Sequence, residues 1–326
     1  TSIRMIFTIL TRSADASLGR LNYESMSQQA LMEMVVGQMS EDNLAAFQDT
    51  QGHFLDVTDW PNIVLNGDGE ISSIDWTDYN SDTTPENQGT ILLEWLPQSI
   101  EGFYIGHRGF EGVFDASKLP IKLQKFYARN TRLSGSLKFS DLPKTLIFLD
   151  MADTLLSGTV DLRAIQKPLT VINLLGNRIS GKIHLTGLSE DLEWLNLGEN
   201  HIEGTADLAH LPSGMKQLHL SDNRFSGTVT LCSLPGGMEA LTLDKNDFFG
   251  TVDLSKLPLT LKSMWLNGNR FSGDVILRDL PETLEYLYLN NNAFDGSVVV
   301  GVVPAPLGHF DISGNAFGEE IVLKMG

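Results

Sequence analysis

The stretch MKQLHLSDNRFSGTVTLCSLP, residues 215–235, recurs as MEALTLDKNDFFGTVDLSKLP at 238–258 and as LKSMWLNGNRFSGDVILRDLP at 261–281. The copies begin 23 residues apart and carry the same residue types at the same offsets. A fixed period of this length is typical of a solenoid, in which each repeat forms one coil and stacks on the next. The same frame extends in both directions without an insertion and gives ten regular repeats, which begin at residues 100, 123, 146, 169, 192, 215, 238, 261, 284 and 307.

The consensus LxxLxLxxNxFSGxVxLxxLP assigns a role to most positions of the repeat. Its LxL core alternates with period two, which predicts a short strand with one buried face. The amide at the ninth position has both donors and an acceptor, so it can satisfy the backbone of a buried turn. We therefore expect a structural ladder of Asn177, Asn200, Asn223, Asn246, Asn269, Asn292 and Asn315. Arg108, Thr131 and Thr154 fill the same slot in the first three regular repeats.

The second half of the repeat predicts the rest of the coil. The eleventh position is apolar throughout and forms a spine that ends in five phenylalanines, Phe225 to Phe317. Glycine at the thirteenth position allows the chain to reverse in a conformation that costs other residues energy. The following VxL segment is expected to return in an extended form, and Leu-Pro closes the coil because proline prevents a helix there.

This pattern resembles the leucine-rich repeat family from about residue 71 to the C-terminus. The SG-x-V/I segment is similar to the plant receptor-type class, and the 23-residue form ending in LP resembles repeats of protist leucine-rich-repeat proteins. The resemblance implies a right-handed solenoid or horseshoe. Short parallel strands would line its concave face, extended segments would line its convex face, and partners would bind on the concave side.

The N-terminal part resembles the plant-type cap of that family. Residues 27–39 predict an apolar-faced helix, and Ser40 is expected to cap a second helix. Residues 56–76, DVTDWPNIVLNGDGEISSIDW, are similar to the tryptophan and hairpin of the cap, with Thr58 and Leu65 roughly where the family has a cysteine pair. We expect an N-terminal arm at 1–23, a helical cap with a hairpin at 24–70, an irregular first repeat at 71–99 and the ten regular repeats at 100–326.

Composition bears on partners and compartment. The chain has 23 Lys and Arg against 41 Asp and Glu, a formal charge of −18. Such a surface repels phosphate backbones and anionic lipids, so a basic protein surface is the better partner than nucleic acid, although acidity also serves solubility alone. No apolar run is long enough to span a membrane. A single cysteine, Cys232, and the absence of any N-x-Ser/Thr sequon favour an intracellular or organellar location over secretion.

The solvent-facing positions of the predicted strand are the candidate binding residues. Exposed aromatic and arginine side chains are the usual anchors of interfaces, while cross-strand packing is the alternative reason for aromatics on a sheet. Asp244 is expected to be exposed on the same face. The candidates form three groups: Tyr104, Tyr127, Arg129, Phe148 and Asp150; Trp194, Asn196 and His219; and Trp265, Tyr286 and Tyr288.

The sequence predicts a binding protein and not an enzyme. It has no nucleophile elbow, kinase motifs or P-loop, and its histidines lack the spacing of a metal site, so we expect neither a cofactor nor a metal. The leading hypothesis is a protein–protein interaction module that uses the concave face. The alternative is a structural subunit held in a large assembly by its ends and its convex ridge.

The tenth repeat is expected to present an uncovered edge. Its apolar set has no following coil in this sequence, and a terminal repeat normally needs a cap with a polar outer face. We therefore expect another chain, or further sequence, to cover the C-terminal edge. The apolar residues concerned are Leu307, Phe310, Ile312, Phe317, Ile321 and Leu323.

Overall fold

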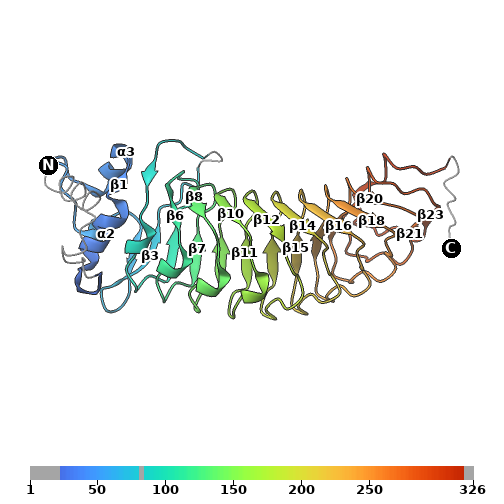
Figure 1. Cartoon of the computed structure of the whole chain (residues 1–326), viewed down its shortest axis with the longest axis horizontal. Helices are drawn as coiled ribbons and strands as arrows, with labels where there is room; N and C mark the ends of the chain where they lie inside the picture. Colours follow the sequence, from blue (N-terminus) through green and yellow to red (C-terminus); the bar gives the residue numbers. More distant parts are fainter. Residues whose placement is uncertain (1–22, 81–83, 319–326) are drawn as a thin grey trace.

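The structure is a computed structural model that describes residues 23–80 and 84–318 (Figure 1). Coils stack along the long axis of the molecule, with helices at the N-terminal end and the tenth repeat at the other end. Except for Tyr23, the expected N-terminal arm lies outside the described residues, as do Ile321 and Leu323 of the last repeat. The described part contains no helix that is long and apolar enough to cross a membrane.

One strand from every coil enters a twelve-stranded sheet. From β3 onward neighbouring strands are parallel and pair one repeat apart, as in Leu195↔Leu218 and Leu218↔Leu241. These leucines are fully buried, whereas the third and fifth positions of each repeat lie on the opposite side, which we call the concave face. The strands are β2 (Ile63–Leu65), β3 (Ile71–Asp75), β5 (Gly102–Tyr104), β7 (Lys125–Tyr127), β9 (Phe148–Asp150), β11 (Val171–Asn173), β13 (Trp194–Asn196), β15 (Gln217–His219), β17 (Ala240–Thr242), β19 (Ser263–Trp265), β22 (Tyr286–Tyr288) and β24 (His309–Asp311).

The segment after the ninth position of each coil contributes a strand to a second sheet. The sequence predicts only a turn and a reversal there. Glycine stays essential within it, because Gly227 and Gly250 adopt left-handed φ values of 93° and 85°. Two further strands, β21 (Val275–Leu277) and β23 (Val298–Val300), pair separately near the C-terminal end. The second sheet consists of β1 (Gln38–Met39), β4 (Gly89–Thr90), β6 (Glu111–Phe114), β8 (Arg132–Gly135), β10 (Leu155–Gly158), β12 (Arg178–Lys182), β14 (His201–Gly204), β16 (Arg224–Gly227), β18 (Asp247–Gly250) and β20 (Arg270–Phe271).

Helices cover the N-terminal end. The Ser27 hydroxyl accepts the Ala30 N–H at the start of α2 (Gln28–Val36), and Ser40 does the same for Asn43 at the start of α3 (Glu41–Leu44). The first helix is shorter than predicted, because Gln38 and Met39 leave it to pair with β4 as β1. Short 3-10 helices complete the turns at Tyr23–Ser25, Ala45–Phe47, Val57–Asp59, Leu93–Trp95, Ala116–Lys118, Phe139–Asp141 and Leu162–Ala164.

The core runs unbroken along the solenoid. In the cap, the ring of Phe47 lies 4.7 Å from that of Trp60 and 5.0 Å from that of Trp76. In the later repeats the eleventh-position phenylalanines stack one above the other, with 6.0 Å between the rings of Phe225 and Phe248. Because the same residue type recurs at the same height in each coil, each coil presents the next with an equivalent apolar surface.

The asparagines of the ninth position join neighbouring coils. The Asn246 amide donates to the Leu243 carbonyl (3.1 Å) of its own coil and the Leu220 carbonyl (3.0 Å) of the preceding one. Its oxygen accepts the Phe225 N–H of that preceding coil at 3.0 Å. Asn200 and Asn269 make the corresponding bonds. The ladder thus satisfies backbone groups at a position where no strand partner is available.

Candidate functional site

The N-terminal part of the concave face carries a hydrogen-bonded aromatic group. The rings of His107 and Tyr127 lie 6.5 Å apart, and the Tyr127 hydroxyl lies 3.3 Å from the imidazole Nε2. Burial raises the pKa of Tyr104 and that of Tyr127, so both remain protonated donors at neutral pH. Tyr79, which the repeat frame does not contain, adds an exposed ring whose hydroxyl donates to Asp75 at 2.9 Å.

Other residues predicted for this group differ in their exposure. The Phe148 side chain is half-buried on β9, between Lys125 and Val171 of the adjacent strands. Arg129 forms an ion pair with Asp153 at 3.1 Å, and both side chains are about one-third exposed, at 36% and 34%. A pair that open contributes little stability, so the guanidinium remains accessible to a partner.

The expectation that Asp150 and Asp244 are exposed is wrong. Their exposures are 7% and 5%. The Asp150 carboxylate turns back to accept the Ala152 N–H (3.0 Å) and is covered by Asn173, which donates to it at 3.0 Å. Asp244 accepts the hydroxyl proton of Ser221 on the preceding coil. Burial raises the pKa of both carboxyls, against the hydrogen bonds that lower it.

The middle group is a linked and largely enclosed set. The Trp194 indole N–H donates to Gln217 at 2.6 Å, and the Trp194 ring meets His219 edge-on at 5.9 Å. Burial lowers the pKa of His219 to about 4, so its imidazole is neutral at pH 7. The Asn196 oxygen accepts the Gly198 N–H at 3.0 Å. These half-buried side chains thus bond to one another and to the backbone.

The C-terminal group is the most open of the three. Trp265 on β19 is 38% exposed and meets Tyr288 on β22 edge-on, with 5.4 Å between ring centroids. Tyr286 on β22 stacks on His309 of β24 at 4.5 Å with the rings almost parallel. His309 is missing from the sequence-based set, although its position in the frame is that of Trp194 and Tyr286. The four rings thus form two packed pairs on three successive strands.

Some carboxylates near the concave face are already paired, but Glu285 and Asp311 beside the C-terminal rings form no ion pair within the described residues. Along one rim of the concave face, Glu193 pairs with Lys216 at 2.7 Å and Glu239 with Lys262 at 2.8 Å. On the other side of the coil, at the sixteenth position, exposed carboxylates each accept the N–H of the residue two positions later, namely in Asp115, Asp161, Asp207 and Asp253. Aromatic and amide groups therefore form much of the concave surface.

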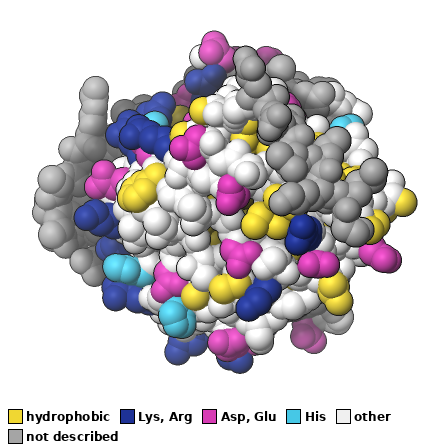
Figure 2. All heavy atoms as spheres, turned by 90° about the vertical axis from the view of Figure 1, so that its right-hand side faces the viewer, with side chains coloured by type: hydrophobic (Ala, Val, Ile, Leu, Met, Phe, Trp, Pro, Cys, Tyr) yellow, Lys and Arg dark blue, Asp and Glu magenta, His cyan; other side chains and the backbone are white. Residues whose placement is uncertain are grey.

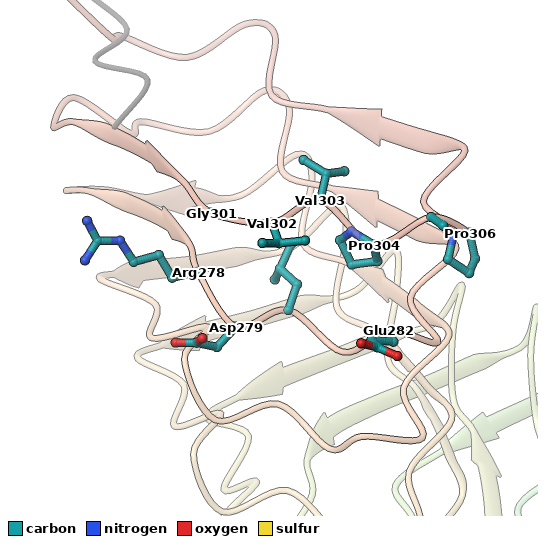
Figure 3. A pocket seen from close by; sticks show the side chains of 10 residues that line it. Arg278, Asp279, Glu282, Gly301, Val302, Val303, Pro304 and Pro306 are labelled. Carbon is teal, nitrogen blue, oxygen red and sulfur yellow. The ribbon is translucent and has the colours of Figure 1, made fainter. Parts of the chain in front are cut away.

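A hollow also lies near the C-terminal end, away from the concave strands (Figure 3). Its lining includes Arg278, Asp279, Glu282, Val302 and Pro304. Figure 3 shows Val302 between the Arg278 and Glu282 side chains, with Asp279 close below Arg278.

The comparisons with known proteins concern the fold. No family model matches the sequence, and no curated protein matches it. A plant ice-binding protein is similar in structure, with a TM-score of 0.61 and 17% sequence identity over 92% of this chain and 97% of that one. The TDR receptor is similar with a TM-score of 0.50 and 20% identity over 76% of this chain, which spans about half (52%) of the receptor structure.

These likenesses agree with what the repeat itself shows. A 23-residue period generates coils of one size, the LxL core of each coil forms a strand of one parallel sheet, and asparagines join successive coils. The repeat pattern, the architecture and the structural likenesses together show that the chain has the fold of a leucine-rich-repeat solenoid.

Proposed function

We propose that this chain is a protein-interaction module that binds a protein or peptide on its concave face, with Trp265, Tyr286 and Tyr288 as the main anchors. The observation that carries the proposal is the exposed aromatic group on β19, β22 and β24. Aromatic side chains contribute a large contact area at a low cost in conformational entropy, and such anchors dominate the affinity of many interfaces. Here the rings already hold one another, as the Trp265–Tyr288 and Tyr286–His309 contacts indicate.

The charges on the concave face indicate which kind of partner it can bind. The carboxylates of Glu193, Glu239 and Asp153 are paired, and those of Asp150 and Asp244 are buried. Part of the negative charge of the concave face is thus paired or buried, whereas Glu285 and Asp311 beside the anchors form no ion pair within the described residues. We therefore infer a partner that is recognised mainly through aromatic contacts, with a donor or a positive charge placed near these two carboxylates.

A display library of random peptides, panned against the immobilised full chain, tests the proposal. The double variant Trp265→Ala/Tyr288→Ala should bind the selected peptides about thirtyfold more weakly, as expected for the loss of roughly 2 kcal/mol at a hot spot. Affinities would be measured by titration calorimetry, and the melting temperature of the variant would show that it is folded.

The control removes apolar side chains elsewhere that are more exposed than Trp265. Phe249 on β18 of the second sheet is 50% exposed and Leu259 is 80% exposed on the far side of the coil. Phe249→Ala/Leu259→Ala should bind the peptides as wild type does. If neither Trp265→Ala/Tyr288→Ala nor Tyr104→Ala/Tyr127→Ala weakens binding, the concave face is not the site. The alternative of a structural subunit held by its ends then takes precedence.

A second candidate function rests on a row of exposed threonines at the fourteenth position. Thr205, Thr228 and Thr251 lie in equivalent places on successive coils, where strands are about 4.8 Å apart. Such a row presents methyl and hydroxyl groups at a regular spacing. The fold is similar to that of a plant ice-binding protein, so we consider ice as a possible ligand of this row. Lys182 interrupts the row on the N-terminal side. Measured thermal hysteresis that Thr228→Lys abolishes would support ice binding over protein binding.

A further inference from the structure

The two ends of the solenoid are closed differently. At the N-terminal end, β2 pairs antiparallel with β3 and β1 pairs antiparallel with β4, so strands of the cap cover both sheets. At the C-terminal end, β24 is the last strand of the twelve-stranded sheet, and no strand among residues 23–80 and 84–318 pairs with its outer side. An uncovered strand of this kind offers its backbone for pairing with another chain.

The hydrogen bonds of β24 show which of its groups face outward. The His309 N–H donates to the Glu285 carbonyl, and the Asp311 carbonyl accepts the Leu289 N–H, so residues 309 and 311 face β22. Alternate residues of a strand direct their backbone groups to opposite sides, so the N–H and C=O of Phe310 point outward. By the 23-residue register, the Gly308 carbonyl and the Ile312 N–H, equivalents of the Glu285 and Leu289 groups, point the same way.

We propose that two copies of this chain associate end to end by antiparallel pairing of β24 with its counterpart, centred on Phe310. The outward-facing groups are complementary to themselves under a two-fold axis. Phe310 exchanges both hydrogen bonds with its own copy, and each Gly308 carbonyl accepts the Ile312 N–H of the other chain. The arrangement continues the twelve-stranded sheet across the axis, and it places at the C-terminal end the kind of antiparallel strand that β2 provides at the N-terminal end.

The side chains match this register as well as the backbone does. Centring on Phe310 places His309 opposite Asp311 of the second copy, twice in the interface. Residues that face each other without exchanging hydrogen bonds bring their side chains closest together, so an imidazole and a carboxylate meet there. Moving the centre by one residue keeps hydrogen-bonded pairs but sets His309 opposite His309, or Asp311 opposite Asp311, so the side-chain pairing favours the register centred on Phe310.

The same end carries the apolar surface that association would cover. Phe310 is 41% exposed although its equivalents in the preceding strands are buried, and Val302 and Val303 of the adjoining loop are 84% and 56% exposed. Figure 2 faces this end and shows hydrophobic side chains interspersed with charged ones of both signs. The mutual repulsion of two chains of charge −18 is screened within about 8 Å at physiological salt.

Sedimentation equilibrium of the full chain at micromolar concentrations and physiological salt tests the proposal. Wild type should reach twice the monomer mass. His309→Asp sets two carboxylates opposite each other, and Asp311→Lys sets a lysine opposite the imidazole, so each should weaken association about tenfold. The double variant His309→Asp/Asp311→Lys restores opposite charges in both contacts and should associate about as tightly as wild type.

A matched pair of substitutions in the middle of the solenoid is the control. His201→Asp/Asp253→Lys makes the same residue changes at exposed positions far from β24 and should leave the mass unchanged. A strictly monomeric wild type overturns the proposal. So does a dimer that neither single substitution weakens, or a double variant that associates more weakly than both singles. None of these outcomes depends on the peptide-binding assay, so the two proposals fail separately.

Discussion

The first regular repeats and the later ones fill the ninth position with different side chains, and the difference shows what the asparagine contributes. Thr131 donates one hydrogen bond, to the Ala128 carbonyl of its own coil at 2.8 Å. Asn246 also bonds within its own coil, but in addition it contacts the Leu220 carbonyl and the Phe225 N–H of the preceding coil. Thr131 therefore closes a turn, whereas Asn246 closes a turn and joins two coils.

Thr154 lies at the boundary between the two regions. Its hydroxyl donates to the Asn177 oxygen at 2.6 Å and also lies 3.2 Å from the Met151 carbonyl, so the first asparagine of the ladder attaches to the last threonine. Arg108, at the start, instead reaches the cap and donates to Asn43 at 2.7 Å. The early repeats thus take part of their support from the cap, while the later ones depend on neighbouring coils.

The largest effect is expected from Asn246→Ala. The change leaves a buried N–H of the preceding coil and carbonyls of both coils without their partner, which should lower the free energy of unfolding by about 3 kcal/mol. Urea denaturation measures this. Asn267→Ala is the control, because its side-chain oxygen accepts no hydrogen bond within the described residues, and its loss should be near neutral. Equal losses for the two variants would mean that the ladder does not join the coils.

A smaller loss is expected from Thr131→Val, which removes a hydroxyl and keeps the shape of the side chain. Only the Ala128 carbonyl loses its partner, so the free energy of unfolding should fall by about 1 kcal/mol. The same urea series provides the measurement. A loss as large as that of Asn246→Ala would contradict the distinction between the two regions.

The smallest effect is expected from Asp244→Asn in the same repeat as Asn246, and it depends on pH. Burial raises the pKa of Asp244 in the folded state, so the folded chain holds this proton more tightly than the unfolded chain. The contribution of Asp244 is therefore favourable below the pKa of the unfolded state and is lost as pH rises through the folded pKa.

Relative to wild type, Asp244→Asn should consequently gain stability between pH 4 and pH 7, by on the order of 1 kcal/mol or less. Chemical denaturation at the two pH values measures the difference. Asp253→Asn is the control, because the pKa of that exposed carboxyl is lowered by its hydrogen bonds with Ser255, and the sign of its pH dependence should be opposite. A gain for Asp253→Asn over the same interval would contradict the assignment of the effect to burial.

The fold was predictable to the extent that it follows from the 23-residue period. The period gives the coil length, the strand in each coil and the asparagine slot. It does not reveal the second sheet, because that segment has no apolar alternation: it holds a single apolar residue in some coils, such as Phe225 between Arg224 and Ser226, and two adjacent ones in others, such as Phe248 and Phe249. The pairing of β14, β16 and β18 depends on contacts between coils, which no single repeat contains.

The positions of the candidate residues on the strands were predictable from the sequence, but the exposure of their side chains was not. The frame locates Trp265, Tyr286 and Tyr288 on neighbouring strands, and the structure brings them together. It gives no sign that Asp150 turns back to the backbone of its own strand, because that choice depends on cover from Asn173 in the next coil. Tyr79 lies outside the repeat frame because it belongs to the interrupted repeat. For the turn at Asp150, the sequence signal that the frame does not use is an aspartate or asparagine followed two residues later by a small residue.

The hairpin of β2 and β3 also has a consequence for how the chain is made. A ribosome releases the N-terminal residues first, at about 5–20 residues per second, so each 23-residue coil emerges in roughly one to five seconds. Because β2 already pairs with β3, each new coil can pair with the strand before it and pack its leucines on the equivalent leucines of the preceding coil. The protein is therefore suited to grow during synthesis by templated addition, with nascent coils ordered one at a time and each folded portion serving as the scaffold for the next.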